Sequence, residues 1–148
     1  MHRRHFLALL PAVLATPVSA FEVIRSDAEW RALLTESQYR VLRLADTEAP
    51  NTSPLTDELR AGTYFCAGCD LALYGSDTKF DSGTGWPSFW QPLPGAVETK
   101  ADIGILGLRT EVHCRRCGGH LGHVFQDGPA PTGLRYCMNG AAMTFRPA

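Results

Sequence analysis

Residues 114–125 read CRRCGGHLGHVF and contain two cysteines and two of the five histidines of the chain. Cys114 and Cys117 have the spacing of a metal-binding turn, and the glycines of the stretch allow the backbone to turn tightly. A second pair with the same spacing, Cys66 and Cys69, lies upstream, and 44 residues separate the two pairs. The two pairs predict that distant hairpins meet, and this decides the fold.

Four cysteines in two Cys-x-x-Cys pairs suit a tetrahedral zinc site in which each pair supplies two thiolates from one turn. Such a site is closed to water, so the metal we expect is structural, one zinc ion held by Cys66, Cys69, Cys114 and Cys117. Two disulfides are the alternative in an exported protein. A disulfide within a Cys-x-x-Cys pair is strained and links almost no chain, so zinc is favoured.

The composition, 45% hydrophobic and 20% charged over 148 residues, is that of one ordinary globular domain. Fourteen glycines and ten prolines favour turns and short strands over long helices, so we expect a mostly β fold. Patterns of β-branched and aromatic residues predict strands at 63–65, 71–74, 97–100, 106–113, 134–139 and 143–145.

Two short helices are predicted near the N-terminus. Residues 26–29 and 35–38 each have the spacing of a capping box. Trp30 and Leu42 would lie on the buried sides of the two helices, which we expect to cover the domain. Residues 46–54, which include two prolines, are predicted to form a loop laid over the surface.

Residues 1–20 have the pattern of an export signal, with a basic start, an apolar run over 6–18 and a small-residue cleavage site at 18–20. Phe21 is the expected mature start, so a single domain would span 21–148. The apolar run is shorter than the ~20 residues needed to cross a bilayer and contains two prolines, so a membrane anchor is the weaker alternative. We expect export to the periplasm of a bacterium.

Arg3 and Arg4, followed after one residue by Phe6 and Leu7, resemble the twin-arginine export signal, which carries folded proteins with their metal bound. An ordinary general-secretion signal is the alternative, and the sequence leaves both open. Without these two arginines the chain keeps twelve basic and fifteen acidic residues, a net charge of −3. That weakly acidic chain gives no basic surface for nucleic acid, so no nucleic-acid partner is expected.

Cys137 is the fifth cysteine and has no evident partner. Alternation along the predicted strand 134–139 places Arg135, Cys137 and Asn139 on one face. The guanidinium of Arg135 would favour the thiolate, which is the nucleophilic form of a cysteine. A buried, inert thiol is the alternative, since free cysteines are among the most buried residues. These residues alone leave both open.

His120 and His123 lie just beyond the second cysteine pair. Because four thiolates already complete a metal site, the two histidines are interpreted as proton donors or water holders near a reacting group. Residues 85–90 read GWPSFW and offer aromatic surface on a fixed backbone. They suit either a core or an apolar substrate pocket, and composition alone favours the core.

Taken together, these stretches resemble the B-type methionine sulfoxide reductases, the family that reduces the R epimer of methionine sulfoxide, usually in protein. The motifs that carry the resemblance are YFCAGC at 64–69, KFDSGTGWPSF at 79–89, RTEV at 109–112, the stretch 114–125, and RYCMN at 135–139. The match runs from about Trp30 to Phe145, and several motifs in the same order make it specific. It implies two antiparallel sheets of the β-tent type, with the structural zinc site away from the catalytic cysteine.

The resemblance also assigns roles. Cys137 matches the nucleophile, and Arg135 would support its thiolate. The remaining expected site residues are His120, His123 and Asn139, which would bind and protonate the sulfoxide oxygen, and Trp86, Phe89 and Phe125, which would hold the substrate. A sulfoxide sulfur becomes electrophilic only when its oxygen is protonated, so a nucleophile and a proton source must face one centre. The expected products are methionine and a sulfenic acid on Cys137.

One position departs from the pattern of many members, which have a resolving cysteine where this chain has Thr84. A threonine cannot attack the sulfenic acid, so we expect an external thiol reductant, thioredoxin-like or other. The other expected partners are oxidised protein substrates, and we expect a monomer with no stable membrane anchor.

Two other functions compete with this one. A zinc-stapled β module could bind a ligand without catalysis, but it would have no need of Cys137 and Asn139 beside two histidines. A thiol oxidoreductase could instead act on disulfides through its Cys-x-x-Cys pairs, and it would then bind no zinc.

Overall fold

A computed structural model describes residues 21–104 and 107–148 of the chain. The predicted export signal, residues 1–20, lies outside the described residues. Within the described part of the chain, no helix combines the length and the apolar character needed to cross a membrane.

Both predicted helices are present, α1 over Asp27–Leu33 and α2 over Glu36–Leu44. Each begins with the predicted capping box, in which the cap hydroxyl and the side chain three residues on bond each other's backbone N–H groups. Trp30 and Leu42 are buried as expected. The sequence therefore fixes where both helices start and which side they bury.

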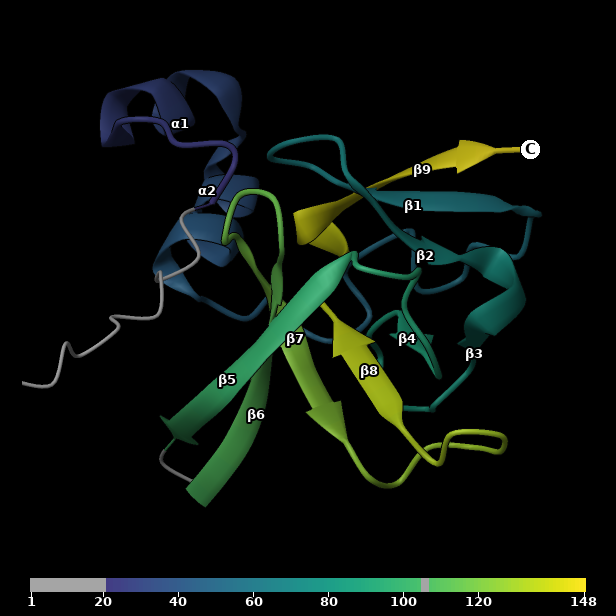
Figure 1. Cartoon of the computed structure of the whole chain (residues 1–148). Helices are drawn as coiled ribbons and strands as arrows, with labels where there is room; N and C mark the ends of the chain where they lie inside the picture. Colours follow the sequence, from purple (N-terminus) through teal and green to yellow (C-terminus); the bar gives the residue numbers. More distant parts are fainter. Residues whose placement is uncertain (1–20, 105–106) are drawn as a thin grey trace, which may run out of the picture.

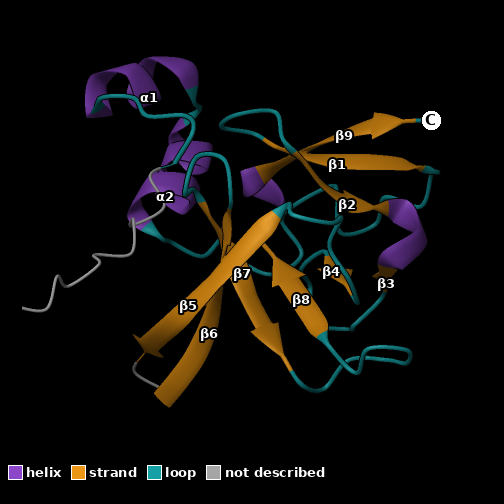
Figure 2. Cartoon of the chain, in the orientation of Figure 1, coloured by secondary structure: helices purple, strands orange, loops and turns teal. Residues whose placement is uncertain are grey.

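The described strands form two antiparallel sheets (Figure 1 and Figure 2). The smaller sheet has the strand order β2 (Ala72–Gly75), β1 (Gly62–Cys66) and β9 (Met143–Pro147). The larger sheet has the order β3 (Lys79–Phe80), β4 (Ser88–Phe89), β8 (Arg135–Met138), β7 (His120–Phe125), β6 (Gly107–Cys114) and β5 (Val97–Gly104). Two single turns of 3₁₀ helix are η1 (Ser76–Thr78) and η2 (Gly140–Ala142). The predicted mostly β fold of two antiparallel sheets with short N-terminal helices is confirmed.

The pairing of β8 with its two neighbours positions the fifth cysteine. Cys137 on β8 lies opposite Ser88 on β4 and opposite His123 on β7. Residues opposite each other in an antiparallel pair point to the same face of the sheet. A Cβ on Gly122 of β7 would overlap the Cys137 carbonyl, so this approach of β7 to β8 requires a glycine.

The core lies between the two sheets and is closed at one end by α2, which packs against β7 and η2. Tyr64, Tyr74 and Phe89 are fully buried there, and the rings of Tyr74 and Phe89 stack with centroids 4.3 Å apart. The expectation that Phe89 holds substrate is corrected, because its ring faces the core and exposes no surface. The alternation of β4 explains the difference, since Ser88 points toward the side of Cys137 and Phe89 points away from it.

Candidate active site

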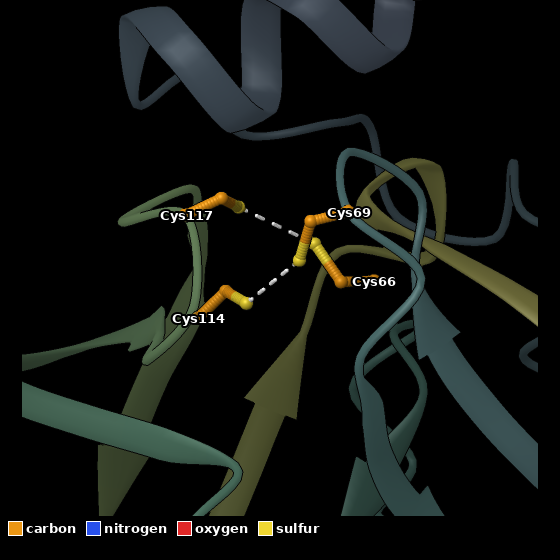
Figure 3. Close-up of side chains that lie close together, drawn as sticks. All are labelled: Cys66, Cys69, Cys114 and Cys117. Atoms are coloured by element: carbon orange, nitrogen blue, oxygen red, sulfur yellow. Dashed lines mark hydrogen bonds between the residues drawn. The ribbon is translucent and has the colours of Figure 1, made fainter. Parts of the chain in front are cut away.

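The four paired cysteines come together as one cluster. Cys66 ends β1 in the small sheet and Cys114 ends β6 in the large one, so each turn extends one sheet toward the other. The ligand atoms all lie within 4.8 Å of one another, with 3.7 Å between the Cys66 and Cys117 sulfurs and 3.5 Å between those of Cys69 and Cys114. Figure 3 shows the sulfurs of both turns pointing into the space between them.

These separations fit a metal ion better than disulfides. Four sulfurs held about 2.3 Å from one tetrahedral ion lie about 3.8 Å from one another, which is close to the observed spacing. A covalent S–S bond is about 2.05 Å, and all five cysteines are free. Hydrogen bonds to Cys114 and Cys117 raise the pKa of the Cys66 thiol, while those from Cys117 and Cys66 lower the pKa of Cys114. The four thiols therefore compete for charge, and a divalent cation would relieve that competition.

A separate cleft of about 170 Å³ contains the fifth cysteine. Its walls come from three strands, β6, β7 and β8, and from three loop positions, and they consist of Thr47, Trp86, Arg109, Gly122, His123, Phe125, Cys137, Met138 and Asn139. Cys137 is half-buried, and its sulfur lies 3.9 Å from the hydroxyl oxygen of Thr84. Of the expected site residues, Cys137, His123, Asn139, Trp86 and Phe125 line this cleft.

Each of the two histidines is bound to a carboxylate. His120 Nδ1 lies 2.7 Å from Glu111 Oε1, and His123 Nε2 lies 2.7 Å from Asp102 Oδ2. The two imidazole rings meet edge to face, with centroids 5.4 Å apart. Carboxylates only accept hydrogen bonds, so each acid fixes which ring nitrogen carries a proton.

The charges around the histidines follow from these contacts. The hydrogen bond from His123 lowers the pKa of Asp102, which also binds Arg109. Burial raises the pKa of Glu111, but the hydrogen bonds from His120 and Lys100 outweigh it and the pKa is lowered. Both acids are thus ionised acceptors at neutral pH.

His120 lies behind His123 rather than on the wall of the cleft. Burial lowers its pKa, although the hydrogen bond that it donates to Glu111 opposes this, so the ring is neutral near pH 7. Its Nε2 is buried and has no hydrogen-bond partner among the described residues. It borders a second recess of about 250 Å³, which Lys100 and His123 also line. His123 therefore lies between His120 and the Cys137 thiol.

Arg135 occupies the position expected from alternation along β8. Its guanidinium donates two hydrogen bonds to Asp127 and lies 4.4 Å from the ring centroid of Phe125. The pKa of Arg135 is raised chiefly by Asp127, against burial, and Cys137 adds a smaller contribution. Asp127 and Phe125 thus hold the arginine in place, two residues before Cys137 on β8.

One residue that sequence reasoning missed connects two walls of the cleft. The Glu48 carbonyl accepts from the indole nitrogen of Trp86 at 3.0 Å, and the Glu48 N–H donates to the Asn139 side-chain oxygen at 3.0 Å. The Glu48 carboxylate accepts the N–H groups of Gly140 at 2.5 Å and Ala141 at 2.9 Å. The loop 46–54 is largely exposed, as predicted, but Glu48 makes it part of the site.

Three further residues near the histidines, Asp102, Arg109 and Glu111, also had no predicted role. Arg109 and Glu111 stand in a motif, RTEV at 109–112, that carried the family resemblance, and this was the one signal available for them. Asp102 had no such signal, because its partner His123 is 21 residues away.

Comparison with known proteins identifies the family of the chain that forms this cleft. A model described as the SelR domain matches residues 34–147. The chain belongs to the SelR family.

Curated relatives of this SelR chain carry one name, peptide methionine sulfoxide reductase MsrB. The protein from Agrobacterium fabrum is 54% identical over 127 residues, covering 85% of this chain and 94% of the relative. Those from Leptospira interrogans and Bradyrhizobium diazoefficiens are 51% and 53% identical, and each aligns with 85% of this chain and with 97% and 91% of its own length. The resemblance stated from the motifs is confirmed.

Replacing Glu48 tests how far this SelR site depends on its loop. We expect Glu48→Gln to lower the free energy of unfolding by about 1–3 kcal/mol, because one buried N–H of η2 then faces an amide N–H instead of a carboxylate. Urea unfolding would measure it. Glu36→Gln, in the exposed first turn of α2, is the matched control and should change stability by less than about 0.5 kcal/mol. Equal effects in the two variants would contradict the role given to Glu48.

Proposed function

We propose that this chain reduces the R epimer of methionine sulfoxide residues in proteins to methionine. The observation that carries the proposal is the cleft, which brings the Cys137 thiol, the His123 ring and the Trp86 indole around one small space. A volume of about 170 Å³ suits a single side chain rather than a large cofactor. The names of the relatives support the same reaction.

The reaction we infer is attack by the Cys137 thiolate on the sulfoxide sulfur. A proton reaches the sulfoxide oxygen from the His123 side of the cleft, which makes the sulfur electrophilic. The oxygen ends on the cysteine, so methionine leaves and a sulfenic acid remains on Cys137. The substrate is reduced by two electrons and the cysteine is oxidised by two. Asp102 holds the imidazole of His123 in one orientation throughout.

The substrate's methyl group would pack against aromatic surface. The Trp86 ring lines the cleft with its N–H bound to the Glu48 carbonyl, so its orientation is fixed by the backbone. Phe125 lines the same cleft under the guanidinium of Arg135. A fixed wall on one side and a polar histidine on the other would distinguish the two epimers, because only one places its oxygen toward His123 when its methyl faces Trp86.

The metal of the cysteine cluster is proposed to be zinc, with a structural role. Zinc prefers four thiolates in tetrahedral geometry, and a site of four protein ligands leaves no position for a substrate. Cys66, Cys69, Cys114 and Cys117 would hold it and join the two sheets. A disulfide reductase acting through either pair is disfavoured, because all four sulfurs face the same point.

The first prediction from the proposed function concerns stereochemistry and the nucleophile. With separated epimers of a methionine sulfoxide peptide and dithiothreitol, turnover is expected for the R epimer alone. Cys137→Ser should lower it by at least about 1,000-fold, as is typical when a nucleophile is removed. Chiral chromatography of the peptide measures both. Equal turnover of the epimers, or an active Cys137→Ser variant that folds normally, would exclude the proposed reaction.

The second prediction concerns the reductant. After a single turnover without thiol, intact-mass spectrometry should detect a gain of one oxygen on Cys137 and no internal disulfide. The reason is that Thr84, whose hydroxyl lies 3.9 Å from the sulfur, has no thiol with which to form one. Thr84→Cys serves as the positive control for disulfide formation. An intramolecular disulfide in the unmodified chain would show that a cluster cysteine resolves the oxidised form, against our proposal of an external thiol.

The third prediction concerns the metal. Elemental analysis of purified protein should find one zinc ion per chain, and Cys114→Ser should lower both the zinc content and the free energy of unfolding, the latter by more than about 3 kcal/mol. Cys137→Ser, which replaces the remaining thiol, is the matched control and should keep its zinc. A fully loaded and equally stable Cys114→Ser variant would contradict the structural role.

Export is a separate proposal. We propose that residues 1–20 direct the chain to the periplasm by the twin-arginine route, after zinc has been bound, since bare thiolates would be exposed to oxidation outside the cytoplasm. Cell fractionation of strains with and without the twin-arginine machinery would measure this, and undiminished export in its absence would favour general secretion. The monomeric state stays a prediction.

A further inference from the structure

A chain of three hydroxyl groups ends at the Cys137 sulfur. Thr84 Oγ1 lies 3.9 Å from Cys137 Sγ and 2.8 Å from Ser82 Oγ. Ser82 Oγ lies 2.7 Å from Ser88 Oγ, which in turn lies 3.1 Å from the backbone carbonyl of Trp86. The path therefore runs from sulfur through three hydroxyls to a carbonyl oxygen.

The inner end of this chain is closed to solvent. Ser88 is fully buried, and it lies directly opposite Cys137 in the β4–β8 pairing. Its hydroxyl forms hydrogen bonds with Ser82 and with the Trp86 carbonyl and with no other group among the described residues. Water therefore does not compete for the Ser88 proton, and the chain must satisfy its own hydrogen bonds.

The hydrogen bonds along the three hydroxyls can run in either of two directions. Each hydroxyl donates one hydrogen bond, a carbonyl only accepts, and a thiol can donate one. When Cys137 is a thiol, every donor points inward, from sulfur to Thr84, then Ser82, Ser88 and the Trp86 carbonyl. When Cys137 is a thiolate, all three hydroxyls can rotate so that Ser88 donates to Ser82, Ser82 to Thr84, and Thr84 to the sulfur.

We propose that this chain stabilises the Cys137 thiolate by delivering a hydrogen bond through Thr84, and that Thr84 is thereby a catalytic residue. The inference deepens the proposed function, because it rests on Cys137 being the nucleophile. Ser82 and Ser88 are positioning residues that set the direction of the Thr84 hydroxyl. A hydrogen bond to an ionised acceptor is roughly twice as strong as a neutral one, so the thiolate direction gains more at the sulfur than it loses at the Trp86 carbonyl.

Charged groups also face the sulfur and must be held constant in any test. His123 lies opposite it on β7, paired with Asp102, and Arg135 lies two residues away on β8, paired with Asp127. Arg109 of β6 lines the same cleft. The strand on the other side, β4, presents the neutral Ser88, so variants of the hydroxyl chain leave every one of these charges in place.

The experiment measures how readily the thiolate forms, in the zinc-loaded full chain. The rate of alkylation of Cys137 by iodoacetamide is followed against pH, with the modified residue located by mass spectrometry. Thr84→Val keeps the shape of the side chain and removes the hydroxyl, so the midpoint of its profile should rise by about one pH unit, a tenfold loss of thiolate at a given pH below the midpoint. Thr84→Ser keeps the hydroxyl and should stay within about 0.3 unit of the unmodified chain.

Ser88→Ala gives the decisive second arm, because its expected shift has the opposite sign. Without the Ser88 hydroxyl, the Ser82 proton loses its inward acceptor, and the Thr84 oxygen is the acceptor that remains to it among the described residues. Ser82 and Thr84 are therefore held in the direction that donates to the sulfur. The midpoint should then fall below that of the unmodified chain. A general disturbance of the fold would instead move Thr84→Val and Ser88→Ala in the same direction.

The outcomes separate this inference from the proposed function. An unchanged midpoint in folded Thr84→Val, or a raised midpoint in Ser88→Ala, would overturn the hydroxyl chain. Should Thr84→Val fail to fold or to bind zinc, the sign of the Ser88→Ala shift still decides. Alkylation needs no sulfoxide, so it tests the hydroxyl chain independently of the reaction. If both variants shift the midpoint as expected but the protein does not reduce the R epimer, the proposed reaction is refuted and the inference about the hydroxyl chain stands.

Discussion

The sulfurs of two cysteine turns meet between the sheets, and the position of the Cys137 thiol depends on this contact. Cys66 ends a strand of the small sheet and Cys114 ends a strand of the large one. The Cys114 N–H donates to the Gly119 carbonyl and closes the turn, and β7 starts at the next residue, His120. The cluster therefore sets where β7 begins, and that start sets which residue of β7 lies opposite Cys137. A metal ion bound by the four cysteines would thus influence the cleft by fixing the pairing of β7 with β8.

Two kinds of polar network meet at Cys137, and they differ in whether the direction of their hydrogen bonds can reverse. On the β7 side, ionised carboxylates fix the protons of His120 and His123, because a carboxylate has no proton to return. On the β4 side, the groups are hydroxyls, each of which can donate or accept. The fixed network suits the proposed role of His123, which is to present a proton in one direction. The reversible network suits the Cys137 sulfur, whose protonation would change during the proposed reaction.

Local patterns predicted the helices, the first hairpin and the cluster of four cysteines, because each depends on residues close in sequence or on a repeated spacing. Alternation along one strand also predicted that Arg135 and Cys137 share a face. Phe89 was misplaced because the resemblance pointed to an aromatic stretch without saying which side of a two-residue strand each ring takes. Glu48 and Asp102 could not be predicted, since their roles consist of contacts with residues 38 and 91 positions away and 21 positions away. Such contacts exist only once the sheets are packed.

The turn at Thr84 brings the side chain at this position within 3.9 Å of the Cys137 sulfur. Gly83 and Gly85, on either side of it, have φ values of 70° and 89°, which other residues adopt only with strain. This geometry aims whatever side chain stands at position 84 at the sulfur. The family resemblance implies a thiol at this position in many members, and such a thiol would capture the oxidised cysteine but would offer only a weak hydrogen bond beforehand. A hydroxyl reverses the balance, since it cannot form a disulfide but donates more strongly to a thiolate. In the proposed reaction, the group at this position therefore acts before the oxygen transfer, and the later reduction falls to an outside thiol.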